Sequence, residues 1–123
     1  MGAKVLVVED DKFLVHAYSL KLEKAGFTVQ IANDGEQALE VLPTFMPDLI
    51  ILDLVMPRKD GFATLTEIKQ QDAYKNIPVL VASNLGQADE ISRAKSLGAA
   101  DFVTKSNLSM NELVDKINSF VAH

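Results

Sequence analysis

The chain has 123 residues, a formal net charge of −5 and no cysteine, and 48% of its residues are hydrophobic and 24% charged, as in one globular domain. The absence of cysteine excludes thiol catalysis, a disulfide scaffold and zinc sites built on cysteine. The acidic balance argues against direct binding of nucleic acid. The apolar runs are too short to span a bilayer, and the N-terminus has no signal-peptide core. We therefore expect a single cytoplasmic domain over residues 1–123.

Short runs of β-branched residues alternate with longer segments of helical periodicity along the whole chain. The predicted strands are Lys4–Val8, Phe27–Ala32, Asp48–Leu52, Pro78–Ala82 and Asp101–Thr104. Three of these runs consist almost entirely of Val, Ile and Leu, which is typical of strands buried on both faces. Repeated β-α units of this kind form a parallel sheet covered by helices. The pattern predicts a doubly wound five-stranded α/β domain, and such folds bind ligands beyond the carboxyl ends of their strands.

Between the predicted strands, apolar residues recur with the spacing of amphipathic helices. The stripes are Leu14, Ala17, Tyr18, Leu22 and Ala25 in the first helix, and Met110, Leu113, Val114, Ile117 and Val121 in the last. Gly26 and Gly98 are expected to end helices, and Asp34 to begin one. Ser109 is the predicted N-cap of the last helix, with Glu112 completing a capping box.

Polar residues follow four of the predicted strands at the point where each strand ends. The first strand is followed by Glu9-Asp10-Asp11, the third by Asp53, the fourth by Ser83 and the fifth by Lys105. Clustered carboxylates repel one another unless a cation intervenes, and ligands that are all oxygens favour a hard ion such as Mg²⁺. The lysine and the hydroxyl both suit an anion. We interpret this edge as a site for a phosphoryl group carried by Asp53.

Each of these residues also has a simpler explanation when it is taken alone. Acidic residues after a strand commonly cap the next helix and interact with its dipole. Serine caps turns and lysine is common on surfaces. The interpretation as a site depends on all four strand ends contributing a matching group to one edge of the sheet.

Four segments, VLVVEDD, DLIILDLVMPRKDG, PVLVAS and AKSLGAADFVTK, carry a specific resemblance to a known family. Over essentially the whole chain, the sequence resembles the response-regulator receiver domain of bacterial two-component signalling. The resemblance implies a flavodoxin-like fold with five parallel strands in the order 2-1-3-4-5. Two helices would cover one face of the sheet and three the other, giving three α/β/α layers.

The resemblance also implies a role for each residue at the strand ends. Asp53 would be the phosphoacceptor, and Lys105 would pair with the phosphoryl oxygens. Ser83 and Phe102 would act as the switch that changes the surface of the fourth helix, fifth strand and fifth helix. The implied Mg²⁺ ligands are Glu9, Asp10, Asp53, the backbone carbonyl of Val55 and, as a further candidate, Asp11.

The implied partners are those of a signalling domain and not of an enzyme, although the domain would promote its own phosphotransfer and dephosphorylation. The phosphoryl donor would be a sensor histidine kinase or a histidine phosphotransfer protein. The output would be a downstream protein or a further output domain, with a homodimer formed on phosphorylation as another option. We expect no direct contact with nucleic acid or membrane. Phe13 and Leu20 lie off the core stripe of the first helix and are candidate contacts for the kinase.

Three features depart from the commonest pattern of the family. Ser106 stands where a proline after a cis bond usually follows the lysine, and Asn84 stands where a smaller residue usually follows the serine. Val55 and Leu85 flank the expected path of an attacking water, and both are apolar. Because neither side chain can orient a water, we predict that the phosphoryl group is lost slowly.

Two other classes of protein stay open. A receiver-like interaction module that works without phosphorylation would tolerate Ser106 and Asn84, but it has little reason to keep Asp53 and Lys105. A flavodoxin-type FMN protein or an aspartyl-phosphate phosphatase would share the topology. The acidic first loop would repel the phosphate of a flavin, and Val55 stands where such a phosphatase has a second aspartate.

Overall fold

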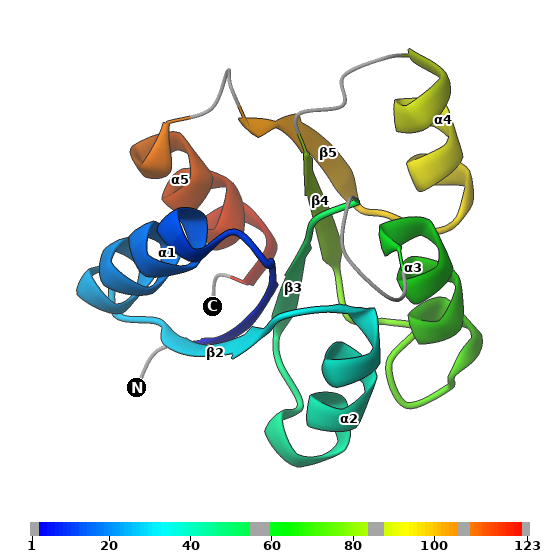
Figure 1. Cartoon of the computed structure of the whole chain (residues 1–123), viewed down its shortest axis with the longest axis horizontal. Helices are drawn as coiled ribbons and strands as arrows, with labels where there is room; N and C mark the ends of the chain where they lie inside the picture. Colours follow the sequence, from blue (N-terminus) through cyan, green and yellow to red (C-terminus); the bar gives the residue numbers. More distant parts are fainter. Residues whose placement is uncertain (1–2, 55–59, 84–87, 106–108, 122–123) are drawn as a thin grey trace.

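The computed structural model describes residues 3–54, 60–83, 88–105 and 109–121, and in it strands and helices alternate along the chain (Figure 1). The elements are β1 (Lys4–Val8), α1 (Lys12–Lys24), β2 (Thr28–Ala32), α2 (Gly35–Phe45), β3 (Leu49–Leu52), α3 (Gly61–Gln70), β4 (Val79–Ser83), α4 (Ala88–Ser96), β5 (Asp101–Thr104) and α5 (Met110–Val121). All strand pairs are parallel, in the order β2-β1-β3-β4-β5. The predicted flavodoxin-like fold is confirmed.

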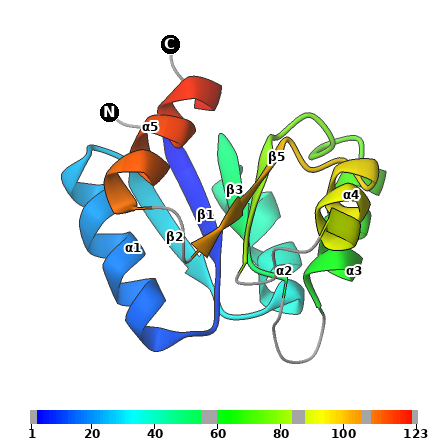
Figure 2. The same cartoon turned by 90° about the horizontal axis from the view of Figure 1, so that it is seen from above.

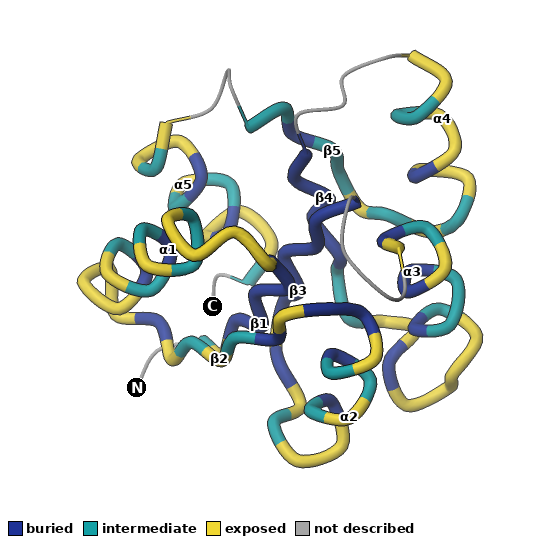
Figure 3. The backbone as a smooth tube through the Cα atoms, viewed as in Figure 1, coloured by how far each residue is buried: buried dark blue, intermediate teal, exposed yellow. Residues whose placement is uncertain are grey.

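The sheet lies between two layers of helices. Helices α1 and α5 cover one face, and α2, α3 and α4 cover the other (Figures 1 and 2). Leu6 and Val8 of β1 belong to the cluster under the three helices, whereas Val5 and Val7 belong to the cluster under α1 and α5. The central strands are therefore buried on both faces, as Figure 3 shows, and this explains their uninterrupted apolar sequences.

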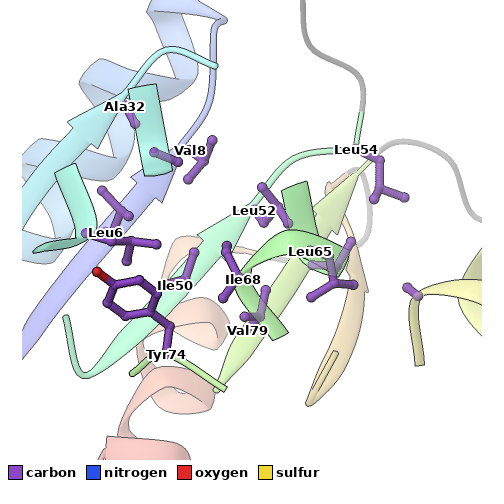
Figure 4. Packing of buried hydrophobic residues seen from close by; sticks show 14 residues of the cluster. Leu6, Val8, Ala32, Ile50, Leu52, Leu54, Leu65, Ile68, Tyr74 and Val79 are labelled. Carbon is purple, nitrogen blue, oxygen red and sulfur yellow. The ribbon is translucent and has the colours of Figure 1, made fainter. Parts of the chain in front are cut away.

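The core under α2, α3 and α4 is built mainly of branched aliphatic side chains. Ile50 and Val79 from the sheet lie near Leu65 and Ile68 of α3 (Figure 4). Tyr74 closes this cluster near the amino ends of the strands. Among the described residues, no helix combines the length and the hydrophobicity needed to cross a membrane.

Helix α1 ends in a glycine-based C-cap, which moves the start of β2 by one residue from the prediction. Gly26 has a φ of 98°, and its N–H donates to the carbonyl of Glu23. The N–H of Phe27 donates to the carbonyl of Leu22, so it is not available to the sheet. Strand β2 consequently begins at Thr28, although Phe27 is buried against the same cluster as Leu22.

Strand β4 begins and ends one residue later than the sequence predicts. Pro78 was expected to begin it, but its carbonyl only accepts a hydrogen bond from Ile50 N–H, and the strand begins at Val79. Ser83, expected to follow the strand, is its last residue and pairs with Thr104 of β5. The serine is therefore held by the sheet itself.

The predicted capping box of α5 is confirmed. The N–H of Glu112 donates to Ser109 Oγ over 3.1 Å, and the N–H of Ser109 donates to Glu112 Oε1 over 3.0 Å. These bonds lower the pKa of the Glu112 carboxyl. Asp34 begins α2 in a related way, accepting from Gln37 N–H over 2.8 Å.

An ion pair ties β5 to α5, and it predicts a pH dependence of stability. Lys116 Nζ donates to Asp101 Oδ2 over 2.6 Å. Burial alone would raise the pKa of Asp101, but the hydrogen bonds from Lys116 and from Phe102 N–H hold it below its ordinary value of 3.8. The stabilisation is thus present above pH 3.8 and is lost as the pH falls through the lowered pKa.

Asp101→Asn is expected to lower the free energy of unfolding at neutral pH by about 0.5–1 kcal/mol, the usual value for a partly exposed pair. In acid, once the pH has fallen through the lowered pKa, the wild-type carboxyl is protonated and the difference should nearly vanish. Urea denaturation at the two pH values measures both quantities. An equal loss at both would show that the ion pair does not stabilise the fold.

Candidate functional site

The site is built where the two central strands end. The N–H of Glu9 donates to the carbonyl of Ala32, and the N–H of Asp53 donates to the carbonyl of Val8, each over 3.0 Å. These bonds continue the pairing of the sheet by one residue past β1 and β3. Glu9 and Asp53 are thereby fixed side by side at the carboxyl edge, as the sequence predicts for parallel strands.

Three carboxylates meet at this edge. Glu9, Asp10 and Asp53 each place one carboxylate oxygen within 4.8 Å of the others. Glu9 and Asp53 are only 2% and 6% exposed, whereas Asp10 faces solvent. Ligands that are all oxygens, with one side open to water, fit a hard divalent cation such as Mg²⁺. Val55, whose carbonyl is the other expected ligand, lies outside the described residues.

Lys105 places its ammonium between the two buried carboxylates. Its Nζ lies 2.5 Å from Glu9 Oε1 and 3.3 Å from Asp53 Oδ1, and its side chain is 11% exposed. Burial raises the pKa of Glu9, the charge of Asp53 adds to this, and Lys105 opposes it without reversing the shift. The lysine is thus the charge that allows two buried carboxylates to lie together.

Asp11 has a different task from its acidic neighbours. Its Oδ1 accepts from Phe13 N–H over 2.9 Å and from Leu14 N–H over 3.3 Å, so Asp11 is the N-cap of α1. Its own N–H donates to Glu9 Oε2 over 3.2 Å. Asp11 is not one of the three clustered carboxylates. Its role as a metal ligand stays a prediction, while the capping role considered from the sequence is present.

The two expected switch residues lie on the neighbouring strands. Ser83 ends β4 and is 1% exposed. Phe102 on β5 is half-buried and packs against the cluster under α2, α3 and α4. The departures noted at Asn84, Leu85 and Ser106 lie outside the described residues.

Tyr18 is a residue near the site that the sequence interpretation placed only in the core stripe of α1. It is 3% exposed, and burial raises the pKa of its phenol, with the charges of Glu9 and Asp53 adding to the shift. The only feature of the sequence that could have pointed to this role is the hydroxyl of Tyr18, because the other residues of the α1 stripe are aliphatic.

A doubly wound sheet with carboxylates and a lysine at its carboxyl edge defines a class of flavodoxin-like signalling domains, and the comparisons with known proteins give the family. A family model described as response regulator receiver domain matches residues 5–118. The chain therefore belongs to the receiver domain family of two-component response regulators.

Individual relatives agree with this family. The DNA-binding dual master transcriptional regulator RpaA of Synechocystis is 31% identical over 96% of this chain and 48% of its own length. The chain spans about half the length of this relative. The receiver domain structure of the Francisella response regulator 1452 is 32% identical, with a TM-score of 0.90 over 98% of this chain and 97% of that one. The Mn²⁺-bound form of response regulator Rcp1 is 31% identical, with a TM-score of 0.82 over 96% and 93%.

Proposed function

We propose that this receiver domain accepts a phosphoryl group on Asp53, from a sensor histidine kinase or a histidine phosphotransfer protein, with Mg²⁺ bound by Glu9, Asp10 and Asp53. The observation that carries the proposal is the position of the Lys105 ammonium, 3.3 Å from Asp53 Oδ1 and beside the carboxylate cluster. Lys105 is a fixed positive charge and Mg²⁺ an exchangeable one, and together they would balance the negative charge of an incoming phosphoryl group. The Mn²⁺-bound state of the similar Rcp1 supports a divalent metal.

The reaction transfers one phosphoryl group between two side chains. A carboxylate oxygen of Asp53 attacks the phosphorus, the new P–O bond forms as the P–N bond of the phosphohistidine breaks, and the imidazole leaves with the bonding electrons. Mg²⁺, when bound, offsets the repulsion between the phosphoryl oxygens and the carboxylates. Lys105 already donates toward Asp53, so a small movement brings it to the phosphoryl oxygens.

The switching part of the proposal involves Ser83, Phe102 and the surface of α4, β5 and α5. In the described part of the chain, α4 has one buried residue, Ala94, and Arg93 stacks on the ring of Phe62 of α3 at 4.1 Å. Among the described residues, Glu90 Oε1 is buried and has no hydrogen-bond partner. An element with so few attachments can be shifted by a modest change in hydrogen bonding at Ser83.

The proposed output is a contact of this surface with a downstream protein, with an output domain or with a second copy of the chain. RpaA is about twice as long as this chain and is described as DNA-binding, which makes an output domain one of these options. The extent of the domain, residues 1–123, and the cytoplasmic location stay predictions.

Incubation with Mg²⁺ and acetyl phosphate tests the function directly. The intact mass of the wild type is expected to rise by one phosphoryl group, and that of Asp53→Ala to stay unchanged. A wild type that never gains the mass, although it is folded and binds Mg²⁺, would favour the phosphorylation-independent interaction module.

The phosphorylated form is expected to persist for much longer than in receivers that reset quickly. Val55 and Leu85 are both apolar, and neither can orient a water for attack on the phosphorus. The loss of phosphate from the purified, phosphorylated protein at constant Mg²⁺ measures the lifetime. Val55→Gln should shorten it several-fold, and a short wild-type lifetime without any phosphatase would refute the argument.

Phe13→Ala is expected to slow phosphotransfer from the cognate kinase about tenfold, a typical effect of removing an aromatic anchor from an interface. Phe13 is 90% exposed at the start of α1, beside the acidic edge, and Leu20 on the same helix is 56% exposed. Phosphorylation by acetyl phosphate should not change, because no docking is involved. Phe120→Ala removes an exposed ring from α5 and is the matched control. Equal kinase rates for both variants would exclude Phe13 from the docking surface.

A further inference from the structure

A small cavity lies behind Lys105, between α1 and α5. Its volume is about 40 Å³, and apolar side chains of α1, β4, β5 and α5 form most of its wall. Three of the lining residues carry polar groups, namely Tyr18, Lys105 and Ser109. A polar cavity of 10–15 Å³ or so already holds a water molecule when polar partners are present. Ser109 is exposed, so water can enter from solvent.

The hydrogen bonds of Lys105 leave one donor to account for. A lysine ammonium has three donors and no acceptor. Within the described part of the chain, the ammonium has two partners, Glu9 Oε1 at 2.5 Å and Asp53 Oδ1 at 3.3 Å. The side chain is only 11% exposed, so the third N–H depends on water close to the protein. The cavity that Lys105 lines is the place for that water.

Tyr18 has the complementary requirement. Its ring is buried in the cluster under α1 and α5. No hydrogen bond joins its hydroxyl to a described residue, and the hydroxyl is not among the fully buried polar atoms without a partner, so water can reach it. A tyrosine with a buried ring usually has a hydrogen-bond partner for its hydroxyl. The ring itself is explained by packing beside Leu22, but a phenylalanine would fill the same space. The hydroxyl is the part that packing does not explain, and the Tyr18 side chain lines the same cavity as Lys105.

We propose that Tyr18 is a positioning residue for Lys105, acting through water held in the cavity that the two side chains share. The water accepts from Lys105 Nζ and donates to Tyr18 Oη, which gives the ammonium its third hydrogen bond. Lys105 is thereby kept between Glu9 and Asp53, where the phosphoryl group arrives. This inference rests on the proposed phosphorylation of Asp53. The charges of Glu9 and Asp53 already act on the phenol, in agreement with its place beside the site.

The chain has two tyrosines, which provide a matched pair of variants. Tyr18→Phe removes the hydroxyl and keeps the ring. Tyr74→Phe makes the same change in the other buried cluster, on the opposite face of the sheet. With Mg²⁺ and acetyl phosphate, Tyr18→Phe is expected to be phosphorylated about threefold to tenfold more slowly than the wild type, the usual net effect of one lost hydrogen bond. Tyr74→Phe should match the wild type.

A crystal structure of the wild type at high resolution gives a readout that does not depend on activity. We expect an ordered water within hydrogen-bonding distance of both Lys105 Nζ and Tyr18 Oη, and its loss or displacement in Tyr18→Phe. A dry cavity, or equal phosphorylation rates for Tyr18→Phe and the wild type, would overturn the inference and leave the proposed function intact. A wild type that is not phosphorylated at all would overturn both.

Discussion

Gly61→Ala is expected to lower the free energy of unfolding by about 3 kcal/mol, a large effect for one methyl group. A Cβ at Gly61 would lie 2.4 Å from the backbone oxygen of Asp53 and 2.5 Å from Cα of Leu54. Backbone atoms of a buried strand end cannot move aside cheaply. The clash falls on Asp53 itself, so we also expect slower phosphorylation of the variant.

Gly26→Ala is the control for this substitution. At Gly26 a Cβ would meet nothing within 4 Å, but the φ of 98° strains any other residue. That strain costs about 1 kcal/mol. Gly26 lies just before the start of β2, at the opposite edge of the sheet from Asp53. Urea denaturation of both variants compares the cost of the steric clash at Gly61 with the cost of the strained φ at Gly26. If Gly61→Ala proved no more destabilising than Gly26→Ala, the close packing of α3 on the end of β3 would be wrong.

Lys105→Met is expected to destabilise the metal-free protein by about 3 kcal/mol at neutral pH, since removing one partner of a buried ion pair leaves uncompensated charge. Glu9 and Asp53 would then face each other without the ammonium that separates them. The pKa of Glu9 is already raised by burial, and the loss of Lys105 raises it further. A carboxyl whose pKa is raised in the folded protein makes folding less stable as the pH increases above its ordinary value of 4.5. The loss of stability in Lys105→Met should therefore be smallest below pH 4.5 and grow above it.

Mg²⁺ should restore much of the stability of Lys105→Met, because the cation supplies positive charge to the same carboxylates. Lys69→Met is the matched control. Lys69 is also partly buried, but it donates to the carbonyls of Lys75 and Ile77, away from the acidic edge. Thermal melting with and without Mg²⁺ distinguishes the two variants. Equal responses to Mg²⁺ would show that Lys105 does not compensate the acidic cluster.

The placement of the acidic cluster was predictable from the sequence, and the reason is topological. The apolar runs Val5–Val8 and Leu49–Leu52 predict buried strands, and the family resemblance implies the strand order that makes them neighbours, as the structure confirms. Adjacent parallel strands deliver the residues that follow them to one edge. Glu9 and Asp53 therefore had to lie close together.

Details that depend on the reach of a side chain or on local hydrogen bonds could not be predicted from the sequence. The longer side chain of Glu9 brings its carboxylate nearer to Lys105 than that of Asp53. Phe27 was predicted to begin the second strand, but its N–H is used by the cap of α1. Tyr18 gave the pattern of a core residue, and only the three-dimensional structure places it beside a cavity that Lys105 also lines.

Mapping the phosphorylated residue tests the central claim most directly. Borohydride reduces an acyl phosphate to an alcohol, so a phosphorylated aspartate becomes homoserine and stays marked in a peptide digest. After treatment with Mg²⁺ and acetyl phosphate, the account predicts homoserine at position 53 and none in the untreated protein. A mark at Glu9 or Asp10, or a phosphorylated chain with an unmarked Asp53, would contradict it.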